Sequence, residues 1–271
     1  NLYFTEVGQT TDAEGNTTLT MRLNTNIEDC YLDFVYTLPA DDYMVGMSIQ
    51  PRNMQLALAQ NMSSVEMQWN QSIPQQEKGR KFEEKYAQLQ YMFIGGEVEK
   101  LSEMKPDRAN ESARLKWIAY KDQFFSTVMI AEEAFESTTM ESTPLNQHSR
   151  YIKEYKTNTT LPLDITGQKS TDLHYYFGPN HYNTLKAYDK DVDKADRLHL
   201  NELVPLGWKI VAWINKVLVI PMFDLFSSWG LHIGIVILLM TLVIKLIILP
   251  FVFASYKSSA KMRVLKPQLD E

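Results

Sequence analysis

The sequence predicts a mainly β domain that is followed by helices which meet a membrane. Up to about Gln168, short runs of β-branched and aromatic residues alternate with turn-forming stretches, a spacing typical of a sandwich of antiparallel strands. No helical pattern of three or more turns competes with this interpretation in the first half of the chain. Residues 231–256 are then nearly all apolar, and at ~1.5 Å per residue a helix of this run is long enough to cross a ~30 Å hydrocarbon core.

The composition is that of a folded protein to which a membrane segment has been added. The 271 residues are 45% hydrophobic and 22% charged, and a net charge of −6 with no Lys/Arg stripe outside the C-terminal tail argues against nucleic-acid binding. Cys30 is the single cysteine, which excludes an internal disulfide and a Cys-based zinc site, and we expect it to be a small buried hydrophobe. The chain begins without an initiator Met or a signal peptide and stops within a helical pattern, so we expect a fragment of a longer protein.

The polar residues of the β domain predict no catalytic site. Acidic side chains and the five histidines are dispersed, without a His–acid pair or the spacing of metal ligands, and no Gly-x-x-x-x-Gly-Lys run marks a nucleotide site. We therefore expect a protein that is not an enzyme and that uses no cofactor and no metal.

The β domain is expected over residues 1–183. Its expected strands are residues 18–23, 31–38, 44–49, 87–94, 115–130, 151–155 and 172–177. Turn-forming stretches such as TDAEGN, SIPQQEKG and ESTTMESTP separate them. After the turn Gly178-Pro179-Asn180 the pattern becomes helical and charged, which predicts a surface connector over residues 184–203.

Residues 204–226 form a second apolar segment with few polar side chains. Lys209 and Lys216 lie seven residues apart, on one narrow stripe of a helix. Trp208 and Trp213 belong to the residue type that favours the headgroup level of a membrane.

Two arrangements of this segment compete. It either crosses the membrane and forms a hairpin with residues 231–256, or it lies in the interface with its lysines towards water. Pro221 and Asp224 fit poorly in hydrocarbon, and a span would also have to bury both lysines. We therefore favour an amphipathic interfacial helix.

Lys245 lies in the second half of the apolar run, which contains no acidic residue to pair with it. A lysine near the middle of a span costs ~2.5–3.5 kcal/mol on insertion scales. Lys257 follows twelve residues later, or ~18 Å along a helix, which is farther than a lysine side chain reaches. The ammonium must therefore face a partner acid on a helix outside this chain, a thinned bilayer, or a water-filled cavity open to the cytoplasm. We favour the cavity, and we expect Pro250, five residues on, to kink the helix.

The segment after the span, residues 257–271, is basic and predicts the orientation of the chain. Positive charge gathers on the cytoplasmic side of a membrane, so this tail is expected in the cytoplasm and residues 1–230 outside, in the periplasm of a bacterium. The cations of this tail are Lys257, Lys261, Arg263 and Lys266. They either contact lipid headgroups, contact the ribosome, or serve only as a topology signal, and the sequence leaves these alternatives open.

Several stretches resemble a known family when they are taken in order. The run WGLHIGIVILLMTLVIKLIILPF with SYKSSAKMRVLKPQL closely resembles the first conserved span and cytoplasmic start of the YidC/Oxa/Alb membrane insertases. The runs FGPNHYNTLKAY, LGWKIVAWINKVLVIPMF and LKWIAYKDQFFSTVMIA resemble the periplasmic domain and its junction with the membrane core in bacterial members. The resemblance covers most of the chain and is weakest before about residue 80.

The resemblance implies a fold and a function. The periplasmic domain would be a β-supersandwich like that of galactose mutarotases, and residues 204–226 would be an amphipathic helix along the periplasmic face of the bacterial inner membrane. The protein would guide nascent membrane proteins into the lipid bilayer through a hydrophilic groove, without covalent catalysis. The Sec translocon and the ribosome are further candidate partners.

The resemblance also implies a role for Lys245. The family carries a cation five residues before a proline of this span, which matches Lys245 and Pro250. Its usual residue is arginine, so lysine keeps the charge but loses the planar fork of donors. The cation would attract the acidic N-terminal stretch of a client, whose transfer into a wet groove lowers the desolvation cost of crossing.

Two other classes remain as alternatives. One is a membrane-tethered periplasmic protein that processes carbohydrate or binds a ligand, which carboxylates clustered around a cleft of the β domain would favour. The other is a single-span receptor, which predicts neither a cation deep in the span nor a lysine stripe on the preceding helix.

Overall fold

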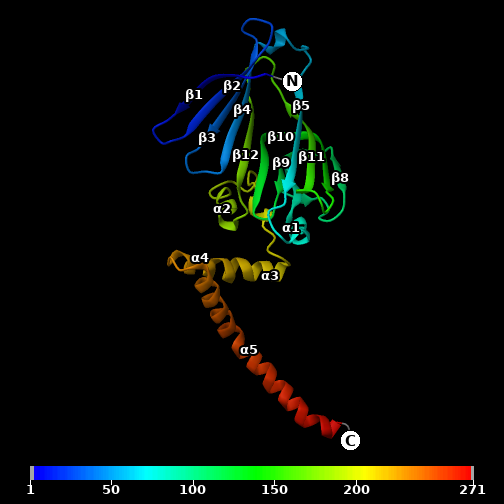
Figure 1. Ribbon diagram of the computed structural model, residues 1–271, viewed down its shortest axis with the longest axis vertical. Coiled ribbons are helices and arrows are strands. Elements are labelled where there is room, and N and C mark those ends of the chain that lie inside the picture. The colour runs from blue at the N-terminus through cyan, green and yellow to red at the C-terminus, as the bar shows by residue number, and fades with distance from the viewer. Residues whose placement is uncertain (1–2, 270–271) are drawn as a thin grey trace. The chain divides into compact units, whose positions relative to one another are not determined.

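The computed structural model of the chain describes the backbone of residues 3–269 and the side chains up to residue 262. It divides into two compact units, Asn1–Val204 and Pro205–Glu271. The first is a β domain and the second consists of helices (Figure 1).

All strand pairs of the β domain are antiparallel. The strands are β1 Thr5–Thr11, β2 Thr17–Asn24, β3 Tyr31–Leu38, β4 Met44–Arg52, β5 Ser64–Pro74, β6 Gln88–Phe93, β7 Val98–Lys100, β8 Asp107–Glu111, β9 Leu115–Lys121, β10 Phe125–Pro144, β11 Tyr151–Pro162 and β12 Thr171–Pro179. The main sheet has the order β1-β2-β3-β4-β12-β10-β9-β6-β7, while β11 pairs with β10 and β5, and β8 pairs with β10. At the edge of the main sheet, a bulge between Glu6 and Gly8 interrupts the pairing of β1 with β2.

The 20-residue strand β10 belongs to both layers of strands. Its first part pairs with β12 and β9, and its second part pairs with β8 and β11. The pairing with β9 shifts register between Ile130 and Phe135, and Ser137 has a left-handed backbone with a φ of 46°. Irregularities of this kind bend a strand, which lets β10 leave one layer and enter the other.

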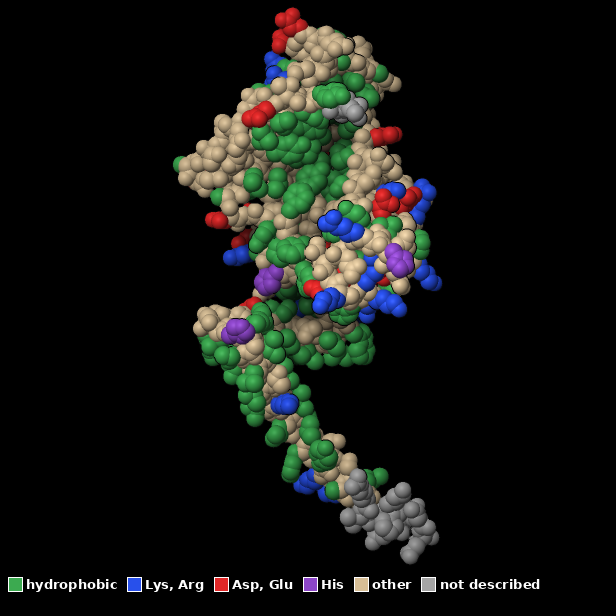
Figure 2. Space-filling view, viewed as in Figure 1, with side chains coloured by type: hydrophobic (Ala, Val, Ile, Leu, Met, Phe, Trp, Pro, Cys, Tyr) green, Lys and Arg blue, Asp and Glu red, His purple; other side chains and the backbone are tan. Residues whose placement is uncertain are grey.

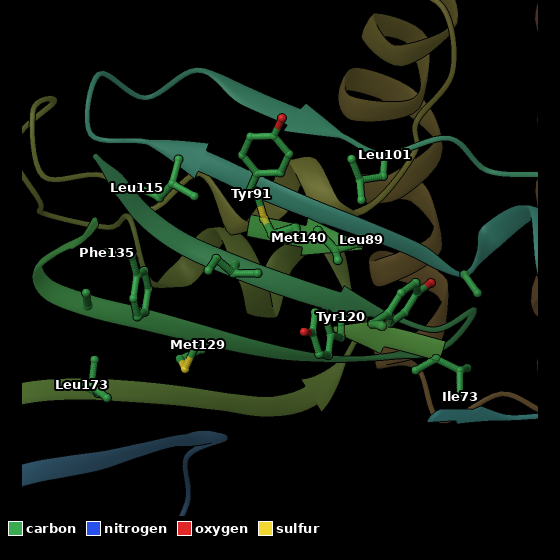
Figure 3. Packing of buried hydrophobic residues seen from close by; sticks show 14 of the residues in the cluster. Ile73, Leu89, Tyr91, Leu101, Leu115, Tyr120, Met129, Phe135, Met140 and Leu173 are labelled. Carbon is green, nitrogen blue, oxygen red and sulfur yellow. The ribbon is translucent and has the colours of Figure 1, made fainter. Parts of the chain in front are cut away.

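The main core fills the space between the two layers. Figure 3 shows Leu115, Tyr120, Met129, Phe135 and Leu173 among its residues, and all five are at most 1% exposed. Side chains that alternate with these along β9 and β10 lie on the opposite face and pack against the helical segments that follow β12. That second cluster contains Trp117, Ala119, Val128, Ile130, Leu185, Leu200 and Leu203. Burial on both faces explains why apolar residues occupy consecutive positions in both strands, at 117–120 of β9 and at 128–131 of β10.

The prediction of a mainly β fold followed by helices, one of them long and apolar, is confirmed. The expectation that ESTTMESTP is a turn was wrong, because these residues are the second half of β10. Thr138, Met140 and Ser142 alternate towards the interior there, so tertiary packing overrides the polar composition. Strands β1, β5, β7 and β8 and the short helix α1, Arg80–Tyr86, were not predicted.

The segment of residues 184–203 differs from the expected helical connector on the surface. Within it, only the residues of α2, Tyr182–Ala187, and of the short 3₁₀ helix η2, Leu200–Leu203, are helical, and residues 188–199 between them are not. Trp117 Nε1 donates a hydrogen bond of 2.6 Å to the carbonyl oxygen of Leu198, and Asp189 accepts the backbone N–H groups of Leu198 and His199. These bonds hold the segment against the sheet, which makes it part of the β domain.

Two buried lysines hold the end of α1. Lys121 is 1% exposed and donates to the carbonyl oxygen of Tyr86 at 2.5 Å. Lys153 is 0% exposed and donates to the carbonyl oxygens of Ala87 and, at 2.6 Å, of Glu103. These carbonyls include the last ones of the helix, which have no partner within it. Burial lowers the pKa of both lysines to about 8.

We expect the free energy of unfolding of the full chain in detergent to rise as the pH is raised from 7 to about 9.5. The folded state releases the protons of Lys121 and Lys153 near pH 8, whereas the unfolded chain keeps them up to the ordinary value of 10.5. Between these values the unfolded state binds more protons, so stability increases with pH, by at most about 1.4 kcal/mol per pH unit and lysine.

Urea unfolding followed by tryptophan fluorescence measures this slope. Lys153→Met should remove about half of it. The matched control Lys81→Met changes an exposed lysine of α1 and should leave the slope unchanged. A flat stability profile in the unsubstituted chain would contradict the burial of the two ammonium groups.

Candidate functional site in the helical unit

The first helix of the second unit is continuous from Lys209 to Ser228 but changes its winding in the middle. It consists of α3, Lys209–Ile214, a π-helical turn η3, Asn215–Val219, and α4, Ile220–Ser228. The π turn directly precedes Pro221, which has no N–H group and whose ring crowds the preceding helical turn. A wider turn relieves this crowding and keeps the helix unbroken.

Large apolar side chains at the start of this helix and along it are exposed and are not covered by the rest of the helical unit. Trp208 and Trp213 are 74% and 63% exposed, and Ile210 and Val217 are 60% and 56% exposed. The predicted lysines Lys209 and Lys216 are exposed on the same helix. Residues 209–228, like 233–262, are long and apolar enough to cross a membrane by length and composition.

A tight corner joins this helix to the next one. Gly230 adopts a φ of 69°, a left-handed conformation that favours glycine, and its N–H donates to the carbonyl oxygen of Ser227 at 3.1 Å. On the other side, His232 Nδ1 accepts the N–H of Gly234 at 3.3 Å, and the His232 carbonyl accepts the N–H of Ile235 at 2.8 Å. The corner therefore satisfies backbone groups at the end of one helix and at the start of the next.

The two helices touch near this corner. Met222 and Phe226 of α4 pack with Val236 of α5, Ile233–Leu269, and with partly buried neighbours up to Ile244. Within the described residues, α3 contributes no side chain to this cluster. Figure 2 shows hydrophobic side chains along much of the visible surface of α5.

Lys245 lies on the exposed surface of α5, twelve residues after Ile233 and twelve before Lys257. Among the described side chains it forms no ion pair. One helical turn earlier, Thr241 donates its hydroxyl to the carbonyl oxygen of Ile237 at 2.8 Å. The helix continues through Pro250, which lacks the N–H that would bond to the carbonyl of Leu246. Lys245 is thus the single charged residue of the apolar run 233–256, at mid-length of that run.

The basic residues after the run continue the same helix. Lys257 and Lys261 are exposed. Arg263 and Lys266 lie outside the residues whose side chains the structure describes. Lys245, Pro250, Lys257 and Lys261 therefore lie on one helix, α5. The residues predicted to lie in the interface belong to the preceding helix, which Trp208 directly precedes and which contains Lys209, Trp213 and Lys216.

The β domain also has a groove that the sequence did not reveal. It has a volume of about 730 Å³, and its lining includes Glu132, Glu133, Asp164 and Asp172. These carboxylates come from β10, from the loop after β11 and from β12, so their spacing along the chain carried no signal. Among the described residues, no group of three or more Asp, Glu, His or Cys side chains is arranged to hold a metal.

Several of these carboxylates have local partners. Asp164 accepts the N–H groups of Thr166, Gln168 and Lys169, and hydrogen bonds from Thr166 hold its pKa below the usual value. Glu133 pairs with Lys169. Glu132 lies 3.7 Å from His174 Nε2, a His–acid pair that the sequence analysis did not detect.

Comparison with known proteins decides the family. A family model described as the YidC periplasmic domain matches residues 1–221. The chain belongs to the YidC periplasmic domain family. The resemblance found in the sequence is thereby confirmed, and the match covers the whole β domain and the helical segments α3 and η3 that follow it.

Longer relatives match the whole chain. "Membrane protein insertase YidC" of Parabacteroides distasonis is 46% identical over 100% of this chain and 42% of its own length, and the protein of that name from Azobacteroides pseudotrichonymphae is 47% identical over 92% of this chain and 41% of its own length. The Bacteroides fragilis protein of that name is 44% identical over 100% of this chain and 43% of its own length. The chain thus spans less than half the length of these relatives.

Among solved structures, an α-galactosidase from Lactobacillus brevis matches with a TM-score of 0.35 and 10% identity, over 66% of this chain and 25% of that one. The family and the two membrane-length helices together support a place at the bacterial inner membrane.

Proposed function

We propose that the chain is the periplasmic domain and first membrane span of an insertase that guides nascent membrane proteins into the inner membrane. Its family and the name of its relatives support this function. In this proposal residues 231–256 cross the bilayer, the basic residues from Lys257 onward lie in the cytoplasm and the β domain lies in the periplasm. The clients and the lipid bilayer are its partners, and the Sec translocon and the ribosome are further candidates.

The observation that carries the mechanism is the exposed ammonium of Lys245 on α5. With twelve residues on either side, it lies ~18 Å along the helix from Ile233 and from Lys257. A lysine side chain cannot cover that distance to reach water at either surface. A cation at this depth needs water or an anion beside it, because burying an unpaired charge in hydrocarbon is unfavourable.

We place this cation in a hydrophilic groove that helices outside this chain complete. The ammonium attracts the acidic stretch of a client and draws it part-way into the wet groove, which lowers the cost of desolvating its polar groups. The client's apolar helix then leaves along α5 into lipid, driven by apolar burial. Pro250 introduces a kink beside the cation, and no covalent step is involved.

Lys245→Ala and Lys245→Glu in the full-length protein should lower the rate of client insertion by about tenfold or more, because each tenfold corresponds to only ~1.4 kcal/mol of lost attraction. Lys245→Arg should retain insertion, since it keeps the charge. Insertion of an acidic-tailed client into vesicles and complementation of a depleted strain measure the effect. Leu246→Ala, a change to an exposed neighbour, is the matched control. Unchanged insertion in both charge-removing variants would end the proposed role of the cation.

We further propose that residues 204–226 lie in the periplasmic interface. Lys209 and Lys216 face water in this arrangement, and Trp208 and Trp213 lie at the headgroup level. The packing of α4 against only the first part of α5 supports it, because a membrane-spanning hairpin would continue that contact along α3.

Cysteine labelling tests this arrangement in the full-length protein. A water-soluble maleimide should modify Lys209→Cys and Lys216→Cys rapidly. It should modify Val211→Cys about tenfold more slowly, because Val211 lies ~200° around the helix from Lys209, on the side that is buried ~5–10 Å below the surface. A span predicts the opposite pattern, in which reactivity follows depth along the helix and not its face. Equal reactivity of Lys209→Cys and Val211→Cys, with Lys216→Cys protected, would favour the span.

The groove of the β domain supports a second candidate function, the binding of a polar ligand such as a saccharide. Glu132, Asp172 and the neighbouring His174 are the groups to test. A sugar that binds at a hundred times its Kd should stabilise the folded chain by about 2.7 kcal/mol. Thermal unfolding of the full chain in detergent with a panel of saccharides would show this as a rise in Tm, which Glu132→Gln should abolish. The absence of any shift would speak against saccharide binding.

A further inference from the structure

The turn between β9 and β10 carries two adjacent phenylalanines in solvent. Phe124 and Phe125 are 47% and 61% exposed. Turns of this kind usually carry small or polar residues, which form the tight backbone conformations and interact with water. Two neighbouring aromatic side chains at such a point therefore need a specific explanation.

The turn is held rigidly by Asn180. Its side-chain amide donates to the carbonyl oxygens of Asp122, Gln123 and Phe125 at 2.9, 3.3 and 3.2 Å. Its backbone N–H donates to the carbonyl oxygen of Phe124 at 2.7 Å. The phenylalanines consequently project from a fixed backbone.

A third exposed aromatic residue lies on α1, a helix whose last turn is bonded to the end of β9. The end of α1 is joined to the base of the turn because Lys121 donates to the carbonyl oxygen of Tyr86 at 2.5 Å. Phe82 is 58% exposed and contacts Tyr86, with ring centroids 4.8 Å apart. Figure 1 shows α1 and α2 at the same end of the β domain.

The exposed charges of α1 are positive, although the whole chain has a net charge of −6. Glu83 of α1 is buried, and Glu84 is paired with Arg80 at 2.7 Å. The exposed charges of the helix are therefore Lys81 and Lys85. Figure 2 shows further Lys and Arg side chains on the visible surface around α1.

The chain leaves the β domain close to this turn. Asn180 precedes α2, whose Leu185 packs with Leu200 and Leu203 of η2. Only four residues, Pro205–Trp208, then lead to α3, and they span at most ~14 Å when fully extended. The linker between this end of the β domain and the helical unit is therefore short.

We propose that the Phe124–Phe125 turn, with Phe82 and the α1 lysines beside it, binds the surface of an anionic phospholipid bilayer. The rings enter the boundary between headgroups and acyl chains, ~5–10 Å deep, and the lysines are attracted to anionic headgroups. A projecting turn suits a deformable surface such as lipid better than a preformed protein pocket. The proposal rests on the membrane attachment of the helical unit, and it adds a second point of contact to that attachment.

A depth-sensitive probe in the full chain tests the proposal. In a Cys30→Ala background, an NBD fluorophore is attached to Phe124→Cys in liposomes that contain phosphatidylglycerol and a lipid with a doxyl quencher at the top of its acyl chain. We expect the lipid quencher to lower the NBD emission at residue 124 at least about threefold more than at the control Ile27→Cys, because only the former enters the lipid. Ile27 is a suitable control since it is 42% exposed in the turn between β2 and β3.

The outcomes separate this proposal from the proposed function. If aqueous iodide quenches the probe at residue 124 as strongly as the probe at residue 27, the lipid-binding proposal is overturned. Protection of residue 124 from both iodide and the doxyl lipid also overturns it, because the turn would then dock on protein. A reference probe at Leu246→Cys on α5 reports whether that helix is in lipid; its failure would count against the insertase proposal, while the result at residue 124 still decides this one. With the probe at residue 124, Phe125→Ser combined with Lys81→Glu and Lys85→Glu should reduce lipid quenching to the level of residue 27, and unchanged quenching would contradict the assigned contact.

Discussion

The β domain depends on one strand whose backbone hydrogen bonds are divided between two layers. β10 pairs with β9 and β12 and then with β8 and β11. The layers cannot separate without breaking these bonds, and the core between them holds Phe135 and Met140 from the two parts of the same strand. The left-handed backbone of Ser137, a conformation that costs of order 1–3 kcal/mol, is maintained because pairing on both sides of it outweighs that cost.

The two units place their apolar side chains in opposite ways. In the β domain, apolar side chains such as Trp117 and Tyr155 are fully buried, and even its buried lysines have carbonyl partners. In the helical unit the backbone satisfies its own hydrogen bonds while the apolar side chains point outward, as a chain must do in lipid. Lys245 is the one charged residue among the apolar residues 233–256 of α5, which is why the proposed mechanism concentrates on it.

The sequence predicts features that depend on local composition. The strands 31–38 and 115–121 are recognisable because their apolar residues are dense, and Lys245 stands out because a charge in an apolar run is unfavourable wherever the partners lie. β1 was missed because its seven residues are all exposed, so no alternation marks a buried face. α1 was missed because Lys121 and Lys153, distant in the sequence, hold its last turn. The carboxylates of the groove come from segments some thirty residues apart, and only the fold brings Glu132 and Asp164 to one place.

The bulge near Gly8 has a consequence for the protein in a crowded envelope. β1 is an end strand of the main sheet, and a straight end strand presents an unbroken row of amide and carbonyl groups to any passing chain. The extra residue at the bulge breaks that row and twists the strand away from a flat template. The β domain is thereby less apt to pair with other chains, or with copies of itself, in an intermolecular sheet.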